Sequence, residues 1–265
     1  RQLLHKILGD GHEVIITRRS CSNLKPLNKK YGVLEAWNIE SDSIEDLFKK
    51  HGDINVIIHC ATDYGRNDSN PLSTFWTNEV LPIKLLQASM SCGIKTFINT
   101  DTFFNTNDSN YEHLGAYALS KRHLQEWGKF LGASGCIEFL NLRLYHLYGP
   151  DDNLEKFVPN MVARCLAGES IDLTKGDQKR DFIHITDAVS AIYLLLIKEC
   201  DYKAAYKEFD IGTGHSVKIN EVCKIINKYC GDIAKLNFGV LNNRAGEFKD
   251  ACANIRPLID MGWTP

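Results

Sequence analysis

The first half of the chain alternates short apolar runs with longer runs of helical periodicity, and this alternation restricts the fold more than any other feature. The apolar runs cover residues 13–17, 33–37, 54–59, 96–100 and 137–144. The helical runs cover residues 43–50, 73–91 and 114–131. Short apolar strands that alternate with helices form a parallel sheet with helices on both faces. We therefore predict the α/β fold class, with a doubly wound parallel sheet.

The pattern changes after residue 148, where a second and smaller unit begins. We predict a sheet domain made of residues 1–148, with residues 181–200 returning to it. Residues 149–180 and 201–265 are predicted to form a smaller α/β lobe. Ligands of open parallel sheets bind beyond the carboxyl ends of the strands. The residues that directly follow each apolar run are therefore the candidates for function.

Composition limits the classes of function. With 265 residues, 44% of them hydrophobic, the chain can bury a sizeable core. Its net charge of −2 and isoelectric point near 6.5 argue against nucleic-acid binding by bulk electrostatics. The longest apolar run, residues 191–197, is much shorter than the ~20 residues of a membrane-spanning helix. We expect neither a nucleic acid nor a membrane as a partner.

Cysteines and histidines show no ligand spacing. The nine cysteines are irregularly placed and include no C-x-x-C pair, which is typical of reduced thiols in a cytoplasmic protein. The nine histidines contain no H-E-x-x-H motif, so no metal site is predicted. His59 ends a buried strand, and we expect it to be a hydrogen-bonded structural residue.

Tyr117 and Lys121 carry the clearest chemical signal. Four residues apart on a helix, the phenol and the ammonium share one face. A tyrosine has a pKa of about 10, and a nearby Lys⁺ favours the phenolate and lowers that pKa. Thr100, at the end of a predicted strand, could orient a substrate oxygen beside them. The alternative interpretation is a surface helix with a packed tyrosine and a solvated lysine.

Further motifs are spread along the chain in a fixed order. They are Asn38-Ile39, His59-Cys60-Ala61-Thr62, Asn78, Thr100, Tyr117 with Lys121, Arg143 with Tyr148-Gly149-Pro150, Arg180-Asp181-Phe182-Ile183-His184, Asp187-Ala188-Val189, Phe209-Asp210-Ile211-Gly212-Thr213-Gly214 and Met261-Gly262-Trp263-Thr264-Pro265. In this order and spacing the chain resembles an extended short-chain dehydrogenase/reductase of the NAD-dependent epimerase/dehydratase family. The resemblance implies a Rossmann-type sheet domain that binds a dinucleotide and a lobe that binds a nucleotide sugar.

The resemblance also implies roles for individual residues. Thr100, Tyr117 and Lys121 would be catalytic, and Lys121 would also hold the nicotinamide ribose. The cofactor would be bound by Asn38 and Ile39 at the adenine, together with Cys60, Ala61, Thr62 and Asn78. A homodimer would form through the helices around 73–91 and 114–131.

The chain begins at Arg1, within a predicted helix. The family that it resembles begins with a strand and a G-x-x-G-x-x-G turn that binds the cofactor pyrophosphate. Residues 1–9 match the end of the helix that follows this turn. We expect the sequence to be a fragment that lacks roughly twenty residues, the size of a first strand and turn.

The turn after the first apolar run indicates the cofactor. It reads Thr17-Arg18-Arg19-Ser20, where an acidic residue would otherwise hold the adenosine ribose of NAD. Arginine binds phosphate with two parallel hydrogen bonds, so Arg18 and Arg19 favour the 2′-phosphate of NADP(H) over NAD(H). A solvated basic turn is the alternative.

The run Asn99-Thr100-Asp101-Thr102-Phe103-Phe104 indicates the reaction. The dehydratases of the family have a Thr-Asp-Glu triplet here, whereas this chain has Thr102 in place of the second carboxylate. A threonine cannot act as that base near neutral pH. The run instead resembles the CDP-abequose and CDP-paratose synthase branch, which implies NADPH-dependent reduction of a nucleotide-linked 4-keto-6-deoxy sugar. An NAD-dependent 4-epimerase and a non-catalytic dinucleotide sensor stay open as alternatives.

Five residues are implied as substrate ligands, namely Asp101, Thr102, Phe157, Arg180 and Arg244. Asp101 could instead cap a loop. Arg180 could instead form a salt bridge with Asp181 or Asp187. Phe157 could be an ordinary core residue.

Overall fold

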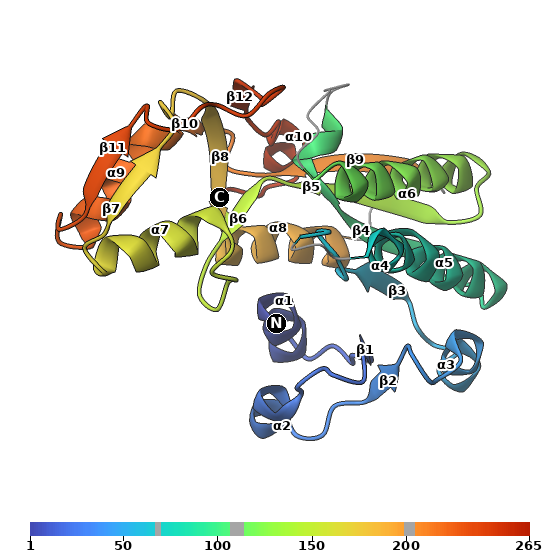
Figure 1. Cartoon of the computed structure of the whole chain (residues 1–265). Coiled ribbons are helices and arrows are strands. Elements are labelled where there is room, and N and C mark those ends of the chain that lie inside the picture. Colours follow the sequence, from blue (N-terminus) through green and yellow to red (C-terminus); the bar gives the residue numbers. More distant parts are fainter. Residues whose placement is uncertain (67–69, 107–113, 199–204) are drawn as a thin grey trace.

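The computed structural model describes residues 1–66, 70–106, 114–198 and 205–265. Its main sheet has four parallel strands in the order β3-β4-β5-β9. These strands are β3 (Val56–His59), β4 (Thr96–Thr102), β5 (Glu138–Leu144) and β9 (Tyr206–Ile211). A separate parallel pair, β1 (Ile16–Arg18) and β2 (Ala36–Asn38), lies beyond the β3 edge (Figure 1). The predicted α/β fold class is confirmed.

Helices cover both faces of the main sheet. One face carries α1 (Gln2–Gly9) and α8 (Ile185–Ile197), and the other carries α3 (Ile44–Lys50), α4 (Pro71–Phe75), the π-helical turn η1 (Trp76–Val80), α5 (Leu81–Ser91) and α6 (Gly115–Ala133). Because strand side chains alternate between faces, Ile98 and Leu140 pack in the core beneath α8, whereas Phe97 and Phe139 pack beneath α5 and α6. Two short helices, α2 (Lys25–Tyr31) and the 3-10 turn η2 (Phe103–Thr106), complete this part.

The face beneath α6 changes from aromatic to charged toward the carboxyl ends of the strands. Three rows cross β4, β5 and β9, namely Phe97-Phe139-Tyr206, Asn99-Asn141-Glu208 and Asp101-Arg143-Asp210. The aromatic rings of the first row stack at 5.4 and 5.9 Å between centroids. In the third row Arg143 donates to Asp210 at 2.7 Å. A polar layer therefore lies beneath the N-terminal part of α6, which carries Tyr117 and Lys121.

The remaining elements are divided between a smaller unit with its own hydrophobic core and the core of the main sheet, which Ile183 and Leu258 join. They are β6 (His146–Tyr148), α7 (Phe157–Leu166), β7 (Ser170–Leu173), β8 (Lys179–His184), β10 (Ser216–Lys218), α9 (Ile219–Tyr229), β11 (Lys235–Phe238), β12 (Asp250–Ala251) and α10 (Arg256–Asp260). β7 pairs with β11, and α7 and α9 pack around Cys165, Ile171 and Cys223. The predicted boundary between 181–200 and 201–265 falls at residues 199–204, outside the described residues.

Candidate active site

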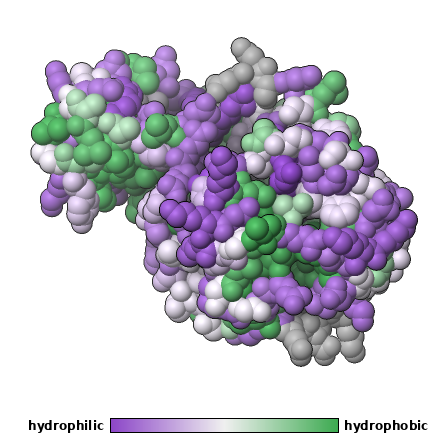
Figure 2. Space-filling view, turned by 90° about the horizontal axis from the view of Figure 1, so that it is seen from below, coloured by the Kyte–Doolittle hydropathy of each residue, from purple (hydrophilic) through white to green (hydrophobic). Residues whose placement is uncertain are grey.

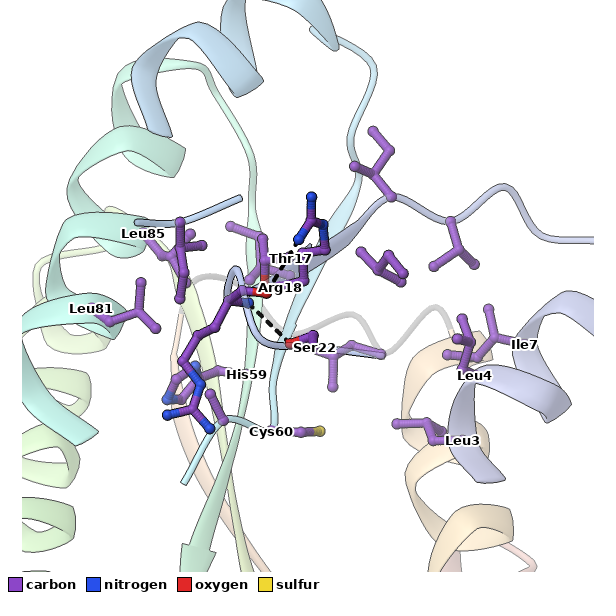
Figure 3. A pocket seen from close by; sticks show the side chains of 18 of the residues that line it. Leu3, Leu4, Ile7, Thr17, Arg18, Ser22, His59, Cys60, Leu81 and Leu85 are labelled. Carbon is purple, nitrogen blue, oxygen red and sulfur yellow. Dashed lines mark hydrogen bonds between the residues drawn. The ribbon is translucent and has the colours of Figure 1, made fainter. Parts of the chain in front are cut away.

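A cavity of about 1980 Å³ separates the two parallel sheet pieces. In the described part of the chain, β1 pairs only with β2 and β3 pairs only with β4, so the facing edges of β1 and β3 border the cavity. Figure 2 shows hydrophobic residues gathered around a hollow on this side of the molecule. Leu3, Leu4 and Ile7 of α1 contribute to its apolar wall (Figure 3).

The carboxyl end of β1 gives the cavity a polar margin. Arg18, Arg19 and Ser22 line it, and the Arg19 backbone amide donates to the Ser22 hydroxyl at 3.1 Å. Asn38 does not line the cavity, and its side-chain amide donates to the Ser20 hydroxyl at 3.0 Å. Ile39 follows β2 and also lines the cavity. The bond between Asn38 and Ser20 joins the turn after β1 to the end of β2. The residues that were expected around the adenosine therefore lie close together.

Glu40 is part of the same turn, and the sequence reasoning overlooked it. Its carboxylate accepts a hydrogen bond from the Ser20 backbone amide at 2.8 Å. Hydrogen bonding by the Ser20 side chain, then this backbone bond and the nearby charges of Arg19 and Arg18, lower the pKa of Glu40. Glu40 follows β2, whereas the expected ribose-binding position follows β1, so the sequence pattern gave no signal for it. Glu40 brings a negative charge to a turn that was expected to be only basic.

The Asn78 side chain anchors the loop after β3 by hydrogen bonds. Its side-chain oxygen accepts from the Asp63 backbone amide at 2.9 Å, and its amide donates to the Asp63 carbonyl at 2.8 Å and to Ser120 at 3.0 Å. Asn78 is fully buried in η1. Cys60, Ala61 and Thr62 of this loop line the cavity. Asn78 does not line it and holds the loop through Asp63.

Thr100, Tyr117 and Lys121 meet at the carboxyl end of β4. The buried Lys121 ammonium donates to the Thr100 carbonyl at 2.8 Å, and the Thr100 hydroxyl donates to the His59 carbonyl at 3.1 Å. Burial lowers the pKa of Lys121 to about 8, although the nearby Asp101 carboxylate opposes this. Lys121 therefore ties α6 to β4 and is mostly charged at neutral pH.

The electrostatics of Tyr117 differ from the sequence expectation. Burial raises its pKa, and the neighbouring Tyr64 acts in the same direction. A hydrogen bond with Thr102 and the charge of Arg66 oppose that rise. The lowering of this pKa that was expected from Lys121 is therefore wrong for this structure, because desolvation is the larger effect. The Thr100 hydroxyl donates to the His59 carbonyl of β3 rather than to Tyr117.

Asp101 points into the interface between the sheet and α6. It is 2% exposed, and its two oxygens accept from the Asn141 side chain at 2.7 Å and the Asn105 side chain at 2.8 Å. Burial raises the pKa of this carboxyl group. Asp101 does not line the cavity between β1 and β3. Strand alternation puts it on the opposite face from Thr100 and Thr102.

His59 is buried and lies beside Asn99 in the register of β3 and β4. Burial, together with the charge of Lys121, lowers its pKa to about 3, so the ring is neutral. Its Nε2 atom has no hydrogen-bond partner within the described residues. A structural position was expected, but the hydrogen bond at this nitrogen was not found.

The structure does not bring the other expected substrate ligands to the cavity. Arg180 is 5% exposed and donates to Glu247 and the Phe248 carbonyl, both at 2.7 Å, so its ion pair is with Glu247 rather than with Asp181 or Asp187. Arg244 is exposed in the loop before β12. Phe157 packs against Phe182, at 6.0 Å between ring centroids, and against the core of the smaller unit.

Residues 1–212 match the NAD dependent epimerase/dehydratase family. The chain belongs to this family. It is an NAD(P)-dependent enzyme of the extended short-chain dehydrogenase/reductase type that acts on nucleotide sugars, as the separated motifs predicted. CDP-abequose synthase of Salmonella muenchen is 35% identical over 263 residues, which are 99% of this chain and 87% of the relative. CDP-abequose synthase of Salmonella typhimurium is 35% identical over 213 residues, 79% of this chain and 71% of the relative.

Solved structures show the same fold at lower identity. The UDP-glucose 4-epimerase of Thermotoga maritima superposes with a TM-score of 0.80 at 21% identity, covering 100% of this chain and 89% of that chain. The UDP-N-acetylglucosamine 4-epimerase of Methanobrevibacter ruminantium gives 0.82 at 22% identity, covering 99% and 88%. Within the described residues no group of histidine, cysteine or acidic side chains could hold a metal ion, and no helix could span a membrane.

Proposed function

We propose that the protein is an NADPH-dependent reductase of a nucleotide-linked 4-keto-6-deoxy sugar. The observation that carries this proposal is Thr102 at the end of β4, at the position where a dehydratase would need a carboxylate base. The overall similarity to enzymes named CDP-abequose synthase supports the same reaction class. In this proposal Thr102 replaces the carboxylate, and no residue removes a proton for elimination of water.

Tyr117 is proposed to be the general acid. Its raised pKa keeps the hydroxyl protonated at neutral pH, and Thr102 and Arg66 stabilise the phenolate that forms when the proton moves to the keto oxygen. The Lys121 ammonium holds the end of β4 and supplies a positive charge at the site. Bound NADPH would supply the hydride to the sugar. Cys60, Ala61, Thr62 and the turn after β1 form a cleft at the carboxyl ends of β1 and β3 that suits a dinucleotide.

The proposed preference for NADP(H) depends on Arg18 and Arg19 and is opposed by Glu40. Glu40 is also the observation that favours the second candidate, an NAD-dependent 4-epimerase, because its carboxylate lies against the turn after β1 and would repel a 2′-phosphate there. A non-catalytic sensor is disfavoured, because it would need neither Tyr117 nor Lys121 in a buried, hydrogen-bonded arrangement.

The proposed activity is tested by following NADPH absorbance with CDP-linked and dTDP-linked 4-keto-6-deoxyhexoses. We expect NADPH oxidation with at least one of them and a loss of about 10²- to 10⁴-fold in Tyr117→Phe, the usual contribution of a general acid. No oxidation with any keto sugar, or an unchanged rate in Tyr117→Phe, would overturn the proposal.

We further propose that the enzyme is a homodimer. Large apolar side chains are exposed on the neighbouring helices α4, η1 and α6, namely Leu72, Phe75, Trp76, Trp127 and Phe130. Exposed aromatic residues of this kind often anchor interfaces. Light scattering should give twice the chain mass, and Trp127→Glu with Phe130→Glu should give the monomer. A monomeric parent protein would refute the dimer.

A further inference from the structure

Asp101 is a buried carboxylate to which the proposed reduction assigns no step. Both of its oxygens accept hydrogen bonds, from the Asn141 side chain at 2.7 Å and from the Asn105 side chain at 2.8 Å. Asn141 in turn accepts from the Asn99 side chain at 2.8 Å. An ionised carboxylate is a pure acceptor, so donors on both oxygens satisfy the charged form. Amides from β4, β5 and η2 therefore hold one negative charge beneath α6.

The Lys121 ammonium enters the same interface from α6. It is fully buried and donates to the carbonyl of Thr100, the residue that precedes Asp101 on β4, at 2.8 Å. A buried ammonium destabilises the fold unless an opposite charge compensates it. Burial has the largest effect on both groups, lowering the pKa of Lys121 and raising that of Asp101, and the charge of each group opposes the effect on the other.

The other titratable groups around Lys121 bring no negative charge at neutral pH. Burial lowers the pKa of His59, at the end of β3, to about 3, so its ring is neutral. Burial raises the pKa of the Cys60 thiol in the following loop and that of the Tyr117 phenol one turn earlier on α6. All three groups are therefore uncharged.

Arg143 does not take Asp101 away from Lys121. It lies beside Asp101 in the register of β4 and β5, but its guanidinium is paired with Asp210 at 2.7 Å and with Glu208 at 3.1 Å. Within the described parts of the chain, the carboxylate that compensates Lys121 is therefore that of Asp101.

We propose that Asp101 is a positioning residue, whose carboxylate, held by Asn141 and Asn105, keeps the Lys121 ammonium charged and in place at the carboxyl end of β4. It acts on the reaction at Tyr117 through Lys121. Its effect on turnover rests on the proposed function, whereas the pairing of the two charges can be measured without turnover. Loss of the negative charge should allow Lys121 to release its proton at a lower pH.

The first arm of the test titrates Lys121 directly and needs no substrate. The full-length protein is labelled with ¹³C at the lysine Cε atoms, and the Lys121 signal is identified by its absence in Lys121→Met. It should titrate near pH 8 in the parent and about one pH unit lower in Asp101→Asn. Glu138→Gln is the matched control, because this partly buried carboxylate accepts from Thr96 at 2.8 Å at the opposite end of β4 and β5.

The titration can refute the pairing in two ways. An unchanged Lys121 titration in Asp101→Asn, or an equal shift in Glu138→Gln, would overturn the proposal. Melting temperatures show whether both variants fold. If Asp101→Asn does not fold, the parent decides, because coupled groups report each other's protonation. Its Lys121 signal should then show a second, smaller inflection at acid pH, where Asp101 takes up a proton, and the absence of that inflection would overturn the pairing.

The second arm separates positioning from contact with the sugar. In the NADPH assay, the fall of kcat/KM at alkaline pH should begin about one pH unit lower in Asp101→Asn than in the parent or in Glu138→Gln. A raised KM for the keto sugar with the pH profile of the parent would identify Asp101 as a substrate ligand and overturn the proposal. A shifted Lys121 titration without any NADPH oxidation would support the charge pair and refute the reductase.

Discussion

Gly128→Ala tests how closely α6, the helix that carries Tyr117 and Lys121, must approach the sheet. A Cβ atom at Gly128 would lie 2.5 Å from two ring carbons of Phe139 and 2.8 Å from a third. Phe139 is fully buried and stacked between the Phe97 and Tyr206 rings, so it cannot rotate away. The added methyl group must therefore push α6 away from β5 or displace the aromatic row.

The size of the effect follows from two opposing contributions. Replacing glycine by alanine inside a helix stabilises it by about 1 kcal/mol, whereas overpacking a close-packed core costs about 1–3 kcal/mol. Gly115→Ala is the matched control, because it lies in the same helix and a Cβ atom there meets nothing within 4 Å. The two variants share most of the helix-propensity gain. Their difference in the free energy of unfolding should therefore be about 1–3 kcal/mol, with Gly128→Ala the less stable.

The comparison is made by urea denaturation and by thermal melting of both variants and the parent. For a chain of this size the difference corresponds to roughly 2–12 °C in melting temperature. Gly128→Ala should also have lower activity than Gly115→Ala, because a shift of α6 moves Tyr117 relative to β4. If Gly128→Ala is as stable as Gly115→Ala, the close contact with Phe139 is not what positions the helix.

Three further predictions concern charge and hydrogen bonding. Because burial lowers the pKa of Lys121 to about 8, its positive charge is present below that pH and lost above it. The value of kcat/KM should therefore fall about tenfold per pH unit above pH 8, and a flat profile to pH 10 would contradict this. Asn141→Leu removes the donor to Asp101 and the acceptor for Asn99, and should cost about 1–3 kcal/mol in urea unfolding, whereas a loss below about 0.5 kcal/mol would show that the buried amides are dispensable. Arg18→Ala should lower the ratio of NADPH to NADH affinity and Glu40→Gln should raise it; fluorescence titrations in which neither ratio changes would show that this turn does not select the cofactor.

Periodicity along the chain predicted the α/β fold because it reflects burial. The runs 54–59, 96–100 and 137–144 correspond to β3, β4 and β5, and each is apolar because helices cover both sides of the sheet. The run 33–37 was less reliable. β2 is Ala36–Asn38, and Val33, 94% exposed, precedes it.

The candidate site could be predicted only in part. Strand alternation alone would have placed Asp101 on the opposite face from Thr100 and Thr102, although the family triplet drew attention to the carboxylate. The approach of Tyr64 and Arg66 to Tyr117 has no local signal, because it depends on how one loop packs against a distant helix. Desolvation of Tyr117 was missed for the same reason, since burial depends on the assembled fold.

The proposed reaction is tested most directly by following the hydride itself. The full-length protein is incubated with NADPH that carries deuterium at C4 of the nicotinamide, in the transferred position, and with a CDP-linked 4-keto-6-deoxyhexose. Mass spectrometry and NMR of the product sugar should show one deuterium, located at C4, in amounts equal to the NADPH consumed. A changed sugar that contains no deuterium and forms without loss of NADPH would contradict the reductase and would identify an epimerase that returns its hydride.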